Sequence, residues 1–257
     1  MAGETAANSG VRATTLRDSV AAPSAGAPAG GSLLNRLPGE PLVELPTDAR
    51  PPSTLGPVVG VLALQGDVLE HVRMLSLAGA RAVAVRHAEQ LADVDGILLP
   101  GGESTTIGTM LVRFDLLEPL RKRLTEGLPA LGTCAGAILM GSRALLADGT
   151  PTEQPLLGVM DTVVRRNAFG RQVASFEGPL DIAGVPGPPL HAVFIRAPWF
   201  ERIGPEVTPL AEVATPLGAK VVVARQGHLL AAAFHPELTG DPRLHALFVD
   251  MIRARSS

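Results

Sequence analysis

The stretch Gly132-Thr133-Cys134-Ala135-Gly136 lies between two apolar segments of the chain. The segment before it, residues 128–133, is expected to form a buried strand, and residues 135–145 are expected to form a helix. A sharp strand-to-helix turn with glycine on both sides of its central residue is typical of a nucleophile elbow. The stretch therefore predicts an α/β fold in which Cys134 stands above the end of a strand.

Strands and helices alternate on the N-terminal side of this turn. Apolar runs at residues 58–64, 81–86 and 96–100 predict buried strands. Helices are expected at residues 67–77 and at residues 105–126, the second with a break near residues 114–115. Further strands are expected at residues 159–165, 171–176, 191–195, 208–214, 220–225 and 229–234, and a closing helix at residues 241–255. The pattern predicts a mostly parallel twisted sheet flanked by helices, with an additional antiparallel region.

Residues 1–57 differ in composition from the rest of the chain. They are rich in Ala, Gly, Pro, Ser and Thr, and they contain no aromatic residue. A segment with so few large apolar groups cannot offset its ordering entropy by burial. We expect a disordered, low-complexity extension over residues 1–57 and a single folded domain over residues 58–257.

The composition also limits the class of function. The net charge of −3 lacks the basic character of a nucleic-acid binder. No apolar run reaches the length of a membrane span, and the N-terminus lacks the pattern of a secretory signal. The single cysteine excludes an intramolecular disulfide. A cytoplasmic protein is expected.

His235 and Glu237 are the candidate partners of the cysteine. His235 follows the apolar run 229–234, and a carboxylate two residues later suits a base and the group that orients it. Taken alone, His-Pro-Glu is equally well explained as a surface turn, and Cys134 as an inert buried cysteine. The glycine frame around Cys134, formed by Gly132 and Gly136, favours instead a triad of Cys134, His235 and Glu237. The other five histidines are assigned surface or packing roles.

Two further regions carry polar groups that suit a ligand. Residues 100–104 follow the third predicted strand and contain Gly101-Gly102, at the sheet edge where ligands of open parallel sheets bind. The alternative for this segment is a strand-to-helix turn without a binding role. A phosphate-binding loop is not indicated, because its Gly-Lys-[Ser/Thr] ending is missing. Arginines at residues 165–172 and 194–198 are read as solvated hairpin ends or as ligands for a substrate carboxylate. No His/Cys cluster has metal-ligand spacing, so neither a metal nor a cofactor is expected.

Taken together, these residues give the chain a resemblance to the triad-type (class I) glutamine amidotransferases. It is most similar to the glutaminase subunits of pyridoxal 5′-phosphate synthase, over residues 58 to about 253. The specific motifs are Leu64-Gln65-Gly66-Asp67 with Glu70-His71, Pro100 to Thr105, Arg166-Asn167 with Phe169 to Gln172, and Phe194 to Pro198. The resemblance implies a flavodoxin-like three-layer sandwich.

The resemblance also implies a reaction and a set of residue roles. Glutamine is hydrolysed to glutamate and ammonia, with Cys134 attacking the amide carbon, His235 moving protons and Glu237 orienting the ring. The N–H groups of Gly102 and Ala135 are expected to hold the oxyanion. The implied glutamine contacts are Gly102, Glu103, Ser104, Arg166, Ile195 and Arg196. Gln65 is expected near the oxyanion hole and the partner surface.

The expected partner is a (β/α)₈-barrel synthase subunit, which uses the ammonia to build pyridoxal 5′-phosphate from ribose 5-phosphate and glyceraldehyde 3-phosphate. Two alternatives stay open. One is a γ-glutamyl peptide hydrolase on the same fold, which would keep the triad but change the substrate. The other is a regulatory subunit without activity. The intact candidate triad argues against the second alternative.

Overall fold

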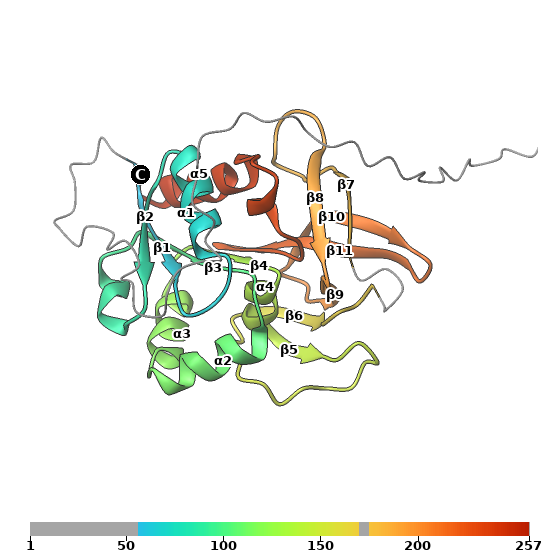
Figure 1. Ribbon diagram of the computed structural model, residues 1–257, viewed down its shortest axis with the longest axis horizontal. Helices are drawn as coiled ribbons and strands as arrows, with labels where there is room; N and C mark the ends of the chain where they lie inside the picture. The colour runs from blue at the N-terminus through green and yellow to red at the C-terminus, as the bar shows by residue number, and fades with distance from the viewer. Residues whose placement is uncertain (1–55, 170–174, 257) are drawn as a thin grey trace, which may run out of the picture. The chain divides into compact units, whose positions relative to one another are not determined.

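Figure 1 shows the computed structural model of the chain, which describes residues 56–169 and 175–256. The predicted N-terminal extension falls outside the described residues, except for Gly56 and Pro57. The strands are β1 (Val58–Leu62), β2 (Arg81–Val85), β3 (Gly96–Leu99), β4 (Ala130–Thr133), β5 (Gly141–Leu145), β6 (Met160–Arg165), β7 (Ser175–Leu180), β8 (Leu190–Ile195), β9 (Trp199–Ile203), β10 (Thr208–Thr215), β11 (Gly218–Gln226) and β12 (Leu229–Ala232). The helices are α1 (Val68–Leu77), α2 (Ser104–Arg113), α3 (Leu117–Thr125), α4 (Ala135–Met140) and α5 (Arg243–Ser256), with 3₁₀ turns η3 (Ala88–Ala92) and η4 (Pro236–Leu238).

The main sheet has the strand order β2-β1-β3-β4-β12-β11-β9-β6-β5, and β10 pairs with β11. The first five strands in this order run parallel to one another. The sheet continues through antiparallel pairs from β12 to β6, and β7 and β8 form a separate antiparallel ribbon. The predicted class, a mostly parallel mixed sheet with an added antiparallel region, is confirmed.

Helices cover both faces of the parallel half of the sheet (Figure 1). Helices α1 and α5 pack together on one side, and α2, α3 and α4 lie on the other. Strands β1, β3, β4 and β12 are buried along their whole length, as expected for strands covered on both faces. At Gly96 of β3 an added Cβ would lie 2.5 Å from Ile252 of α5. Close packing against that helix therefore leaves little room for a side chain at this position, and a larger residue would require Ile252 to move.

The predicted helix over residues 135–145 is wrong in its second half. Helix α4 ends at Met140, and Gly141 begins β5, which pairs with β6. An added Cβ at Gly141 would lie 3.0 Å from Val164 of β6, so the two strands approach closely there. This pairing connects residues about twenty positions apart and outweighs the local helix preference.

Other departures are smaller. The break predicted near residues 114–115 is present, because Asp115 has a positive φ of 52° between α2 and α3. Strand β9 was not predicted. The strand predicted at 171–176 lies mostly outside the described residues, and β7 begins at Ser175. In the described part of the chain, no helix combines the length and the apolar character needed to cross a bilayer.

Candidate active site

Cys134 stands at the sharp turn between β4 and α4. Its backbone has φ 46° and ψ −100°, a strained conformation for a residue with a side chain. The neighbouring strand β12 holds this conformation, because the Cys134 N–H donates to the Ala232 carbonyl over 2.8 Å. An added Cβ at Gly132 would lie 2.6 Å from the Met140 sulfur, and one at Gly136 would collide with the Leu99 carbonyl. Both glycines of the frame are therefore required by packing.

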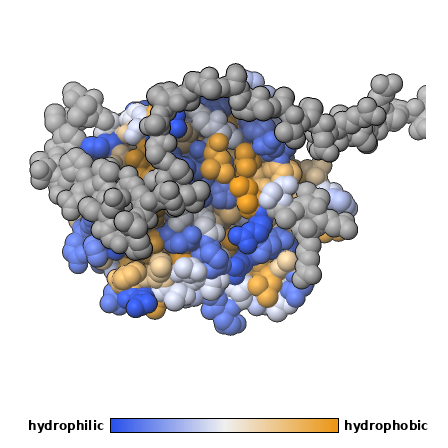
Figure 2. Space-filling model, viewed as in Figure 1, coloured by the Kyte–Doolittle hydropathy of each residue, from blue (hydrophilic) through white to orange (hydrophobic). Residues whose placement is uncertain are grey.

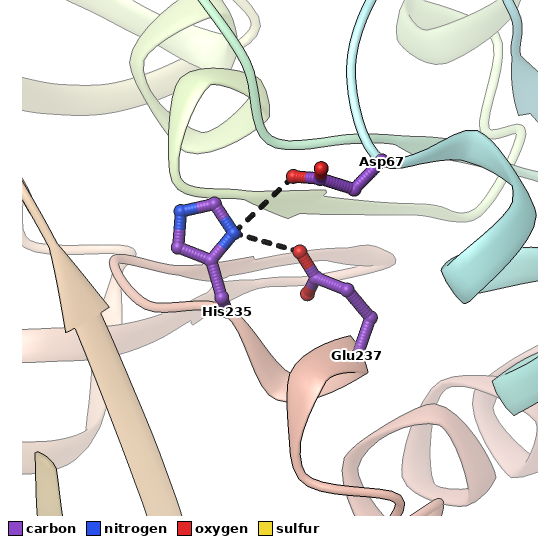
Figure 3. Close-up of side chains that lie close together, drawn as sticks. All are labelled: Asp67, His235 and Glu237. Carbon is purple, nitrogen blue, oxygen red and sulfur yellow. Dashed lines mark hydrogen bonds and ion pairs between the residues drawn. The ribbon is translucent and has the colours of Figure 1, made fainter. Parts of the chain in front are cut away.

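His235 lies beside this turn, three residues after the end of β12. Its N–H donates to the Val193 carbonyl of β8 over 2.9 Å. The ring Nδ1 lies 2.7 Å from Oε1 of Glu237 and 3.5 Å from Oδ2 of Asp67 (Figure 3). Cys134 is also within hydrogen-bonding range of the ring. With Nδ1 occupied by carboxylates, Nε2 is the ring nitrogen left to face the sulfur.

The surroundings of His235 keep its ring protonated at neutral pH. Burial lowers the pKa of His235, but hydrogen bonds with two carboxylates and with Cys134 outweigh burial and raise the pKa from 6.5 to about 12. Glu237 is itself buried in η4, and burial raises the pKa of its carboxyl against the opposing effect of the nearby ring. A protonated imidazole next to a sulfur is the pair that cysteine nucleophiles use.

Asp67 belongs to this cluster and was not predicted as a site residue. It lies between β1 and α1, and its hydrogen bond to His235 lowers the pKa of its carboxyl. Gly101 packs against both groups, since an added Cβ there would lie 2.5 Å from Cε1 of His235 and 3.1 Å from Oδ2 of Asp67. The available sequence signal was its position after β1, at the same sheet edge as Cys134. Asp67, His235 and Glu237 also offer metal-ligand atoms within 4.8 Å of one another, but Nδ1 of His235 already takes part in the 2.7 Å hydrogen bond.

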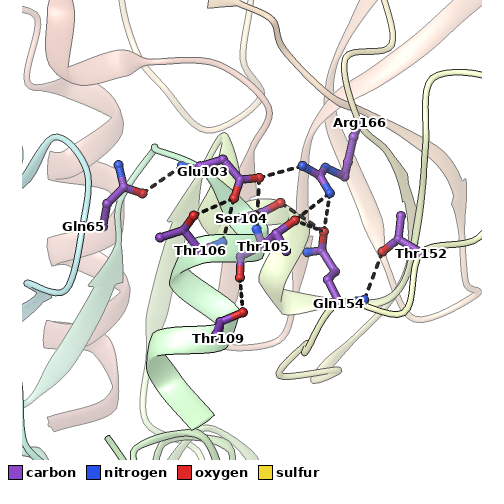
Figure 4. Close-up of polar contacts among 9 residues, drawn as sticks. All are labelled: Gln65, Glu103, Ser104, Thr105, Thr106, Thr109, Thr152, Gln154 and Arg166. Carbon is purple, nitrogen blue, oxygen red and sulfur yellow. Dashed lines mark hydrogen bonds and ion pairs between the residues drawn. The ribbon is translucent and has the colours of Figure 1, made fainter. Parts of the chain in front are cut away.

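The loop after β3 is tied to the loop after β1 through Gln65. Oε1 of Gln65 accepts from the Glu103 N–H over 2.9 Å (Figure 4). Gly102 has φ 145°, and an added Cβ there would lie 2.6 Å from the same Gln65 oxygen, so only glycine fits. Gly102 and Ala135 thus both lie at the carboxyl ends of neighbouring strands. As the first residue of α4, Ala135 has an N–H with no partner inside its helix.

Arg166 is the centre of a second polar cluster, which also contains Glu103 and Ser104. Its guanidinium lies 2.7 Å from Oε1 of Glu103 and donates to Oε1 of Gln154 over 2.7 Å (Figure 4). Ser104 donates to the same Gln154 oxygen over 3.2 Å. Burial acts to raise the pKa of Glu103, but hydrogen bonds from the start of α2 and the charge of Arg166 lower it. Gln154 was not predicted, because it lies in a turn-rich loop without any motif.

Ile195 is the last residue of β8 and Arg196 follows it; neither is part of the cluster in Figure 4. Arg196 has a positive φ of 44°. The turn that contains them is joined to the turn after Arg166, because the Ala168 N–H donates to the Ala197 carbonyl over 3.0 Å. The structure therefore brings the two turns together, while Arg171 and Gln172 lie outside the described residues.

The fold and the elbow are those of a glutamine amidotransferase. A crystal structure of a glutamine amidotransferase superposes with a TM-score of 0.69 at 47% identity, over 76% of this chain and 98% of that one. The PurLQS structure from Thermotoga maritima has a TM-score of 0.55 over 79% of this chain and 100% of that one, and at 14% identity it shows the fold alone.

The chain belongs to the SNO glutamine amidotransferase family, whose model matches residues 61–254. The pyridoxal 5′-phosphate synthase subunit PdxT of Frankia casuarinae is 60% identical over 202 residues, which are 79% of this chain and 98% of that protein. PdxT of Mycobacteroides abscessus is 56% identical over 200 residues, which are 78% of this chain and 100% of that protein.

Proposed function

We propose that the chain hydrolyses L-glutamine to L-glutamate and ammonia, and that the ammonia is used for pyridoxal 5′-phosphate synthesis. One observation carries the chemical part of the proposal. Cys134, the single cysteine of the chain, sits at a strained elbow beside His235, and Glu237 holds the far side of that ring over 2.7 Å. Membership of the amidotransferase family supports glutamine as the substrate. The sequence identity to PdxT proteins supports the use of the ammonia for pyridoxal 5′-phosphate synthesis.

The first half-reaction uses the proton on His235. The sulfur of Cys134 attacks the side-chain amide carbon of glutamine, and the carbonyl oxygen takes the negative charge. The N–H groups of Gly102 and Ala135 are proposed to stabilise this oxygen. As the carbon–nitrogen bond breaks, the His235 imidazolium gives its proton to the nitrogen. Ammonia leaves, and a thioester and a neutral imidazole remain.

The second half-reaction restores the starting state. Water attacks the thioester carbon while neutral His235 accepts a proton from that water. The carbon–sulfur bond then breaks, which releases glutamate and leaves the Cys134 thiolate next to protonated His235. The buried Glu237 carboxylate keeps the ring in one orientation throughout. No step needs a metal or an organic cofactor.

The second polar cluster suits the amino-acid end of glutamine. Arg166 has the planar donor geometry that binds carboxylates, and we assign it to the α-carboxylate. Glu103 carries a negative charge at neutral pH, since its pKa is lowered, and it suits the α-ammonium group. Gly102 lies in the loop after β3 and Ser104 begins α2. Ile195, at the end of β8, and Arg196, directly after it, complete the proposed glutamine contacts.

A docked partner follows from the chemistry of ammonia. In neutral water ammonia is mostly ammonium, which is not a nucleophile, so the product must reach its acceptor through a protected path. The proposed partner is a (β/α)₈-barrel synthase subunit. Ile195, a proposed glutamine contact, has an exposed fraction of 40%, and Leu238, which directly follows Glu237, has one of 46%; both suit the edge of such an interface. Figure 2 shows hydrophobic residues exposed among hydrophilic ones on one face of the molecule.

The test is ammonia release from glutamine by the purified chain, with and without the synthase subunit and in the presence of a chelator. We expect turnover that rises on addition of the synthase, that is lost in Cys134→Ala, and that the chelator leaves unchanged. γ-Glutamyl peptides as the preferred substrate would indicate the alternative hydrolase. The absence of covalent labelling of Cys134 by a glutamine-mimic electrophile would indicate a subunit without activity.

A further inference from the structure

Two fully buried histidines lie directly behind the Glu237 carboxylate. Nε2 of His71, in α1, is 3.4 Å from Oε2 of Glu237, the oxygen that does not bind His235. Nδ1 of His71 is 3.0 Å from Nε2 of His245, in α5. Both histidines have an exposed fraction of 0%. Two helices far apart in the sequence thus place a second ring against the candidate triad.

The same ring also reaches the segment that carries the nucleophile. Nε2 of His71 is 3.0 Å from the hydroxyl oxygen of Thr133, the residue directly before Cys134. Thr133 is itself completely buried. His71 therefore contacts both sides of the triad, the strand that carries the sulfur and the carboxylate that orients the base.

The pattern of unpaired atoms decides which nitrogen of His71 carries the proton. If Nε2 carries it, His71 donates to Thr133, points the same N–H at Oε2 of Glu237 over 3.4 Å and accepts from His245. No donor of this cluster is then unpaired, and the atoms left without a hydrogen bond are two acceptors, Nδ1 of His245 and Oε2 of Glu237. If Nδ1 carries it, Oε2 of Glu237 faces a lone pair, and the Nδ1–H of His245 is an unpaired buried donor. A buried donor without an acceptor and a carboxylate that faces a lone pair both cost free energy, so the first arrangement is favoured.

Both histidines are neutral at neutral pH. Burial lowers the pKa of His71 well below 6.5, with the nearby His245 and His235 adding to the effect. Burial alone lowers the pKa of His245 to about 4. His71 therefore supplies a hydrogen-bond donor without a positive charge, and the charge of Glu237 remains available to the His235 ring.

We propose that His71 is a positioning residue of the triad: its Nε2–H faces Oε2 of Glu237 at 3.4 Å and attracts that oxygen, and His245 fixes the tautomer that makes this possible. A carboxylate bonded to His235 at one oxygen and facing a donor at the other is hindered from rotating, so the ring keeps the orientation that faces Cys134. The inference rests on the proposed function, because its main readout is glutamine hydrolysis.

The test compares His71→Leu with His71→Gln. The leucine removes the donor, while the glutamine amide returns an N–H near the position of Nε2. We expect kcat to fall about 10- to 100-fold in His71→Leu, since a misplaced catalytic group has effects of this size, with KM within about twofold. In His71→Gln we expect kcat within about threefold of wild type.

The pH profile separates positioning from packing. The ionisable groups that face Glu237 are His71, His235 and Asp67, and His71 also faces His245. Loss of a donor to the ionised carboxylate raises its pKa, so the acidic limb of kcat/KM should move to higher pH in His71→Leu and stay in place in His71→Gln.

Two further variants complete the design. His245→Leu keeps the His71 ring but removes the group that fixes its proton on Nε2, so part of the population can carry the proton on Nδ1 instead. We therefore expect a loss of kcat smaller than in His71→Leu. His228→Leu is the matched control, because the ring of this histidine bonds the Leu124 carbonyl over 2.8 Å and the residue directly precedes β12, at the opposite end of that strand from His235. Its kcat should match wild type. Thermal unfolding is measured for every variant.

Several outcomes would overturn the inference. Equal kcat in wild type and His71→Leu would do so, as would equal losses in the leucine and glutamine variants. If His71→Leu does not fold, His245→Leu decides, and a kcat equal to wild type in that variant would contradict the tautomer assignment. A wild-type chain with no glutaminase activity would refute the proposed function as well, which separates the two failures.

Discussion

The two polar clusters of the site differ in how much of their geometry is fixed before substrate arrives. The group around Cys134, His235 and Glu237 is buried, framed by glycines and held by backbone hydrogen bonds between strands. The group around Glu103 and Arg166 is partly exposed, and its charged side chains bind each other. The reacting end is therefore preformed, whereas the end assigned to the amino-acid group must exchange partners when glutamine binds.

Replacing Glu237 by glutamine should have the largest effect. The amide preserves shape but cannot hold the protonated ring through a carboxylate, so we expect kcat to fall about 10³- to 10⁴-fold, as for the orienting carboxylate of other triads. KM should change little. Steady-state ammonia release measures both parameters. A loss that appears in KM alone would mean that the buried cluster is not preformed for chemistry.

Replacing Arg166 by alanine should act on binding. Loss of a charge-assisted hydrogen bond to the α-carboxylate should raise KM about 10- to 50-fold, with kcat within about threefold. Arg166→Lys should recover only part of this, because a lysine cannot reproduce the planar pair of donors. The same kinetic assay is used. A selective loss of kcat would remove the distinction between the two clusters.

Replacing Gln154 by leucine should give a smaller change of the same kind. Oε1 of Gln154 accepts from Arg166 and Ser104, so its loss frees the guanidinium without removing it. We expect KM to rise about two- to fivefold and kcat to stay near wild type, in line with the loss of one hydrogen bond to a charged group. An effect larger than that of Arg166→Ala would contradict the order of roles.

The pH dependence of stability tests whether the buried cluster is charged in the resting enzyme. His235 has a folded-state pKa raised to about 12, so its contribution to the free energy of unfolding is fully present below pH 6.5 and is lost as the pH rises toward 12. The stability difference between wild type and His235→Asn should therefore shrink with rising pH across this window. Urea unfolding at several pH values measures it, and a constant difference would contradict a protonated ring.

The elements of the parallel half could be predicted because their signals are local. The apolar runs of β1, β3 and β4 and the glycine frame around Cys134 are each contained in a few consecutive residues. The end of α4 could not be predicted, since β5 forms only by pairing with β6. Long-range pairing of this kind leaves no periodic pattern in the segment itself.

The candidate site shows the same division. Cys134, His235 and Glu237 stand in short motifs, and the structure brings His235 together with both of the others. Asp67 stands in the motif Leu64-Gln65-Gly66-Asp67, but this motif did not indicate a contact with His235, and Gln154 lies outside every motif. The roles of these two residues depend on loops that meet only after the sheet has formed. Because the contacting residues are far apart in the sequence, the sequence alone did not predict these roles.

One pairing in the sheet links folding to activity. Thr133 of β4 and Ala232 of β12 are register partners, and the Cys134 N–H bonds the Ala232 carbonyl. The nucleophile and the base therefore emerge from two adjacent strands that meet across about a hundred residues of chain. A slip of one position between these strands would misplace both groups at once. Recovery of turnover after denaturation should thus report closure of this single strand pair, with no half-active intermediate before it.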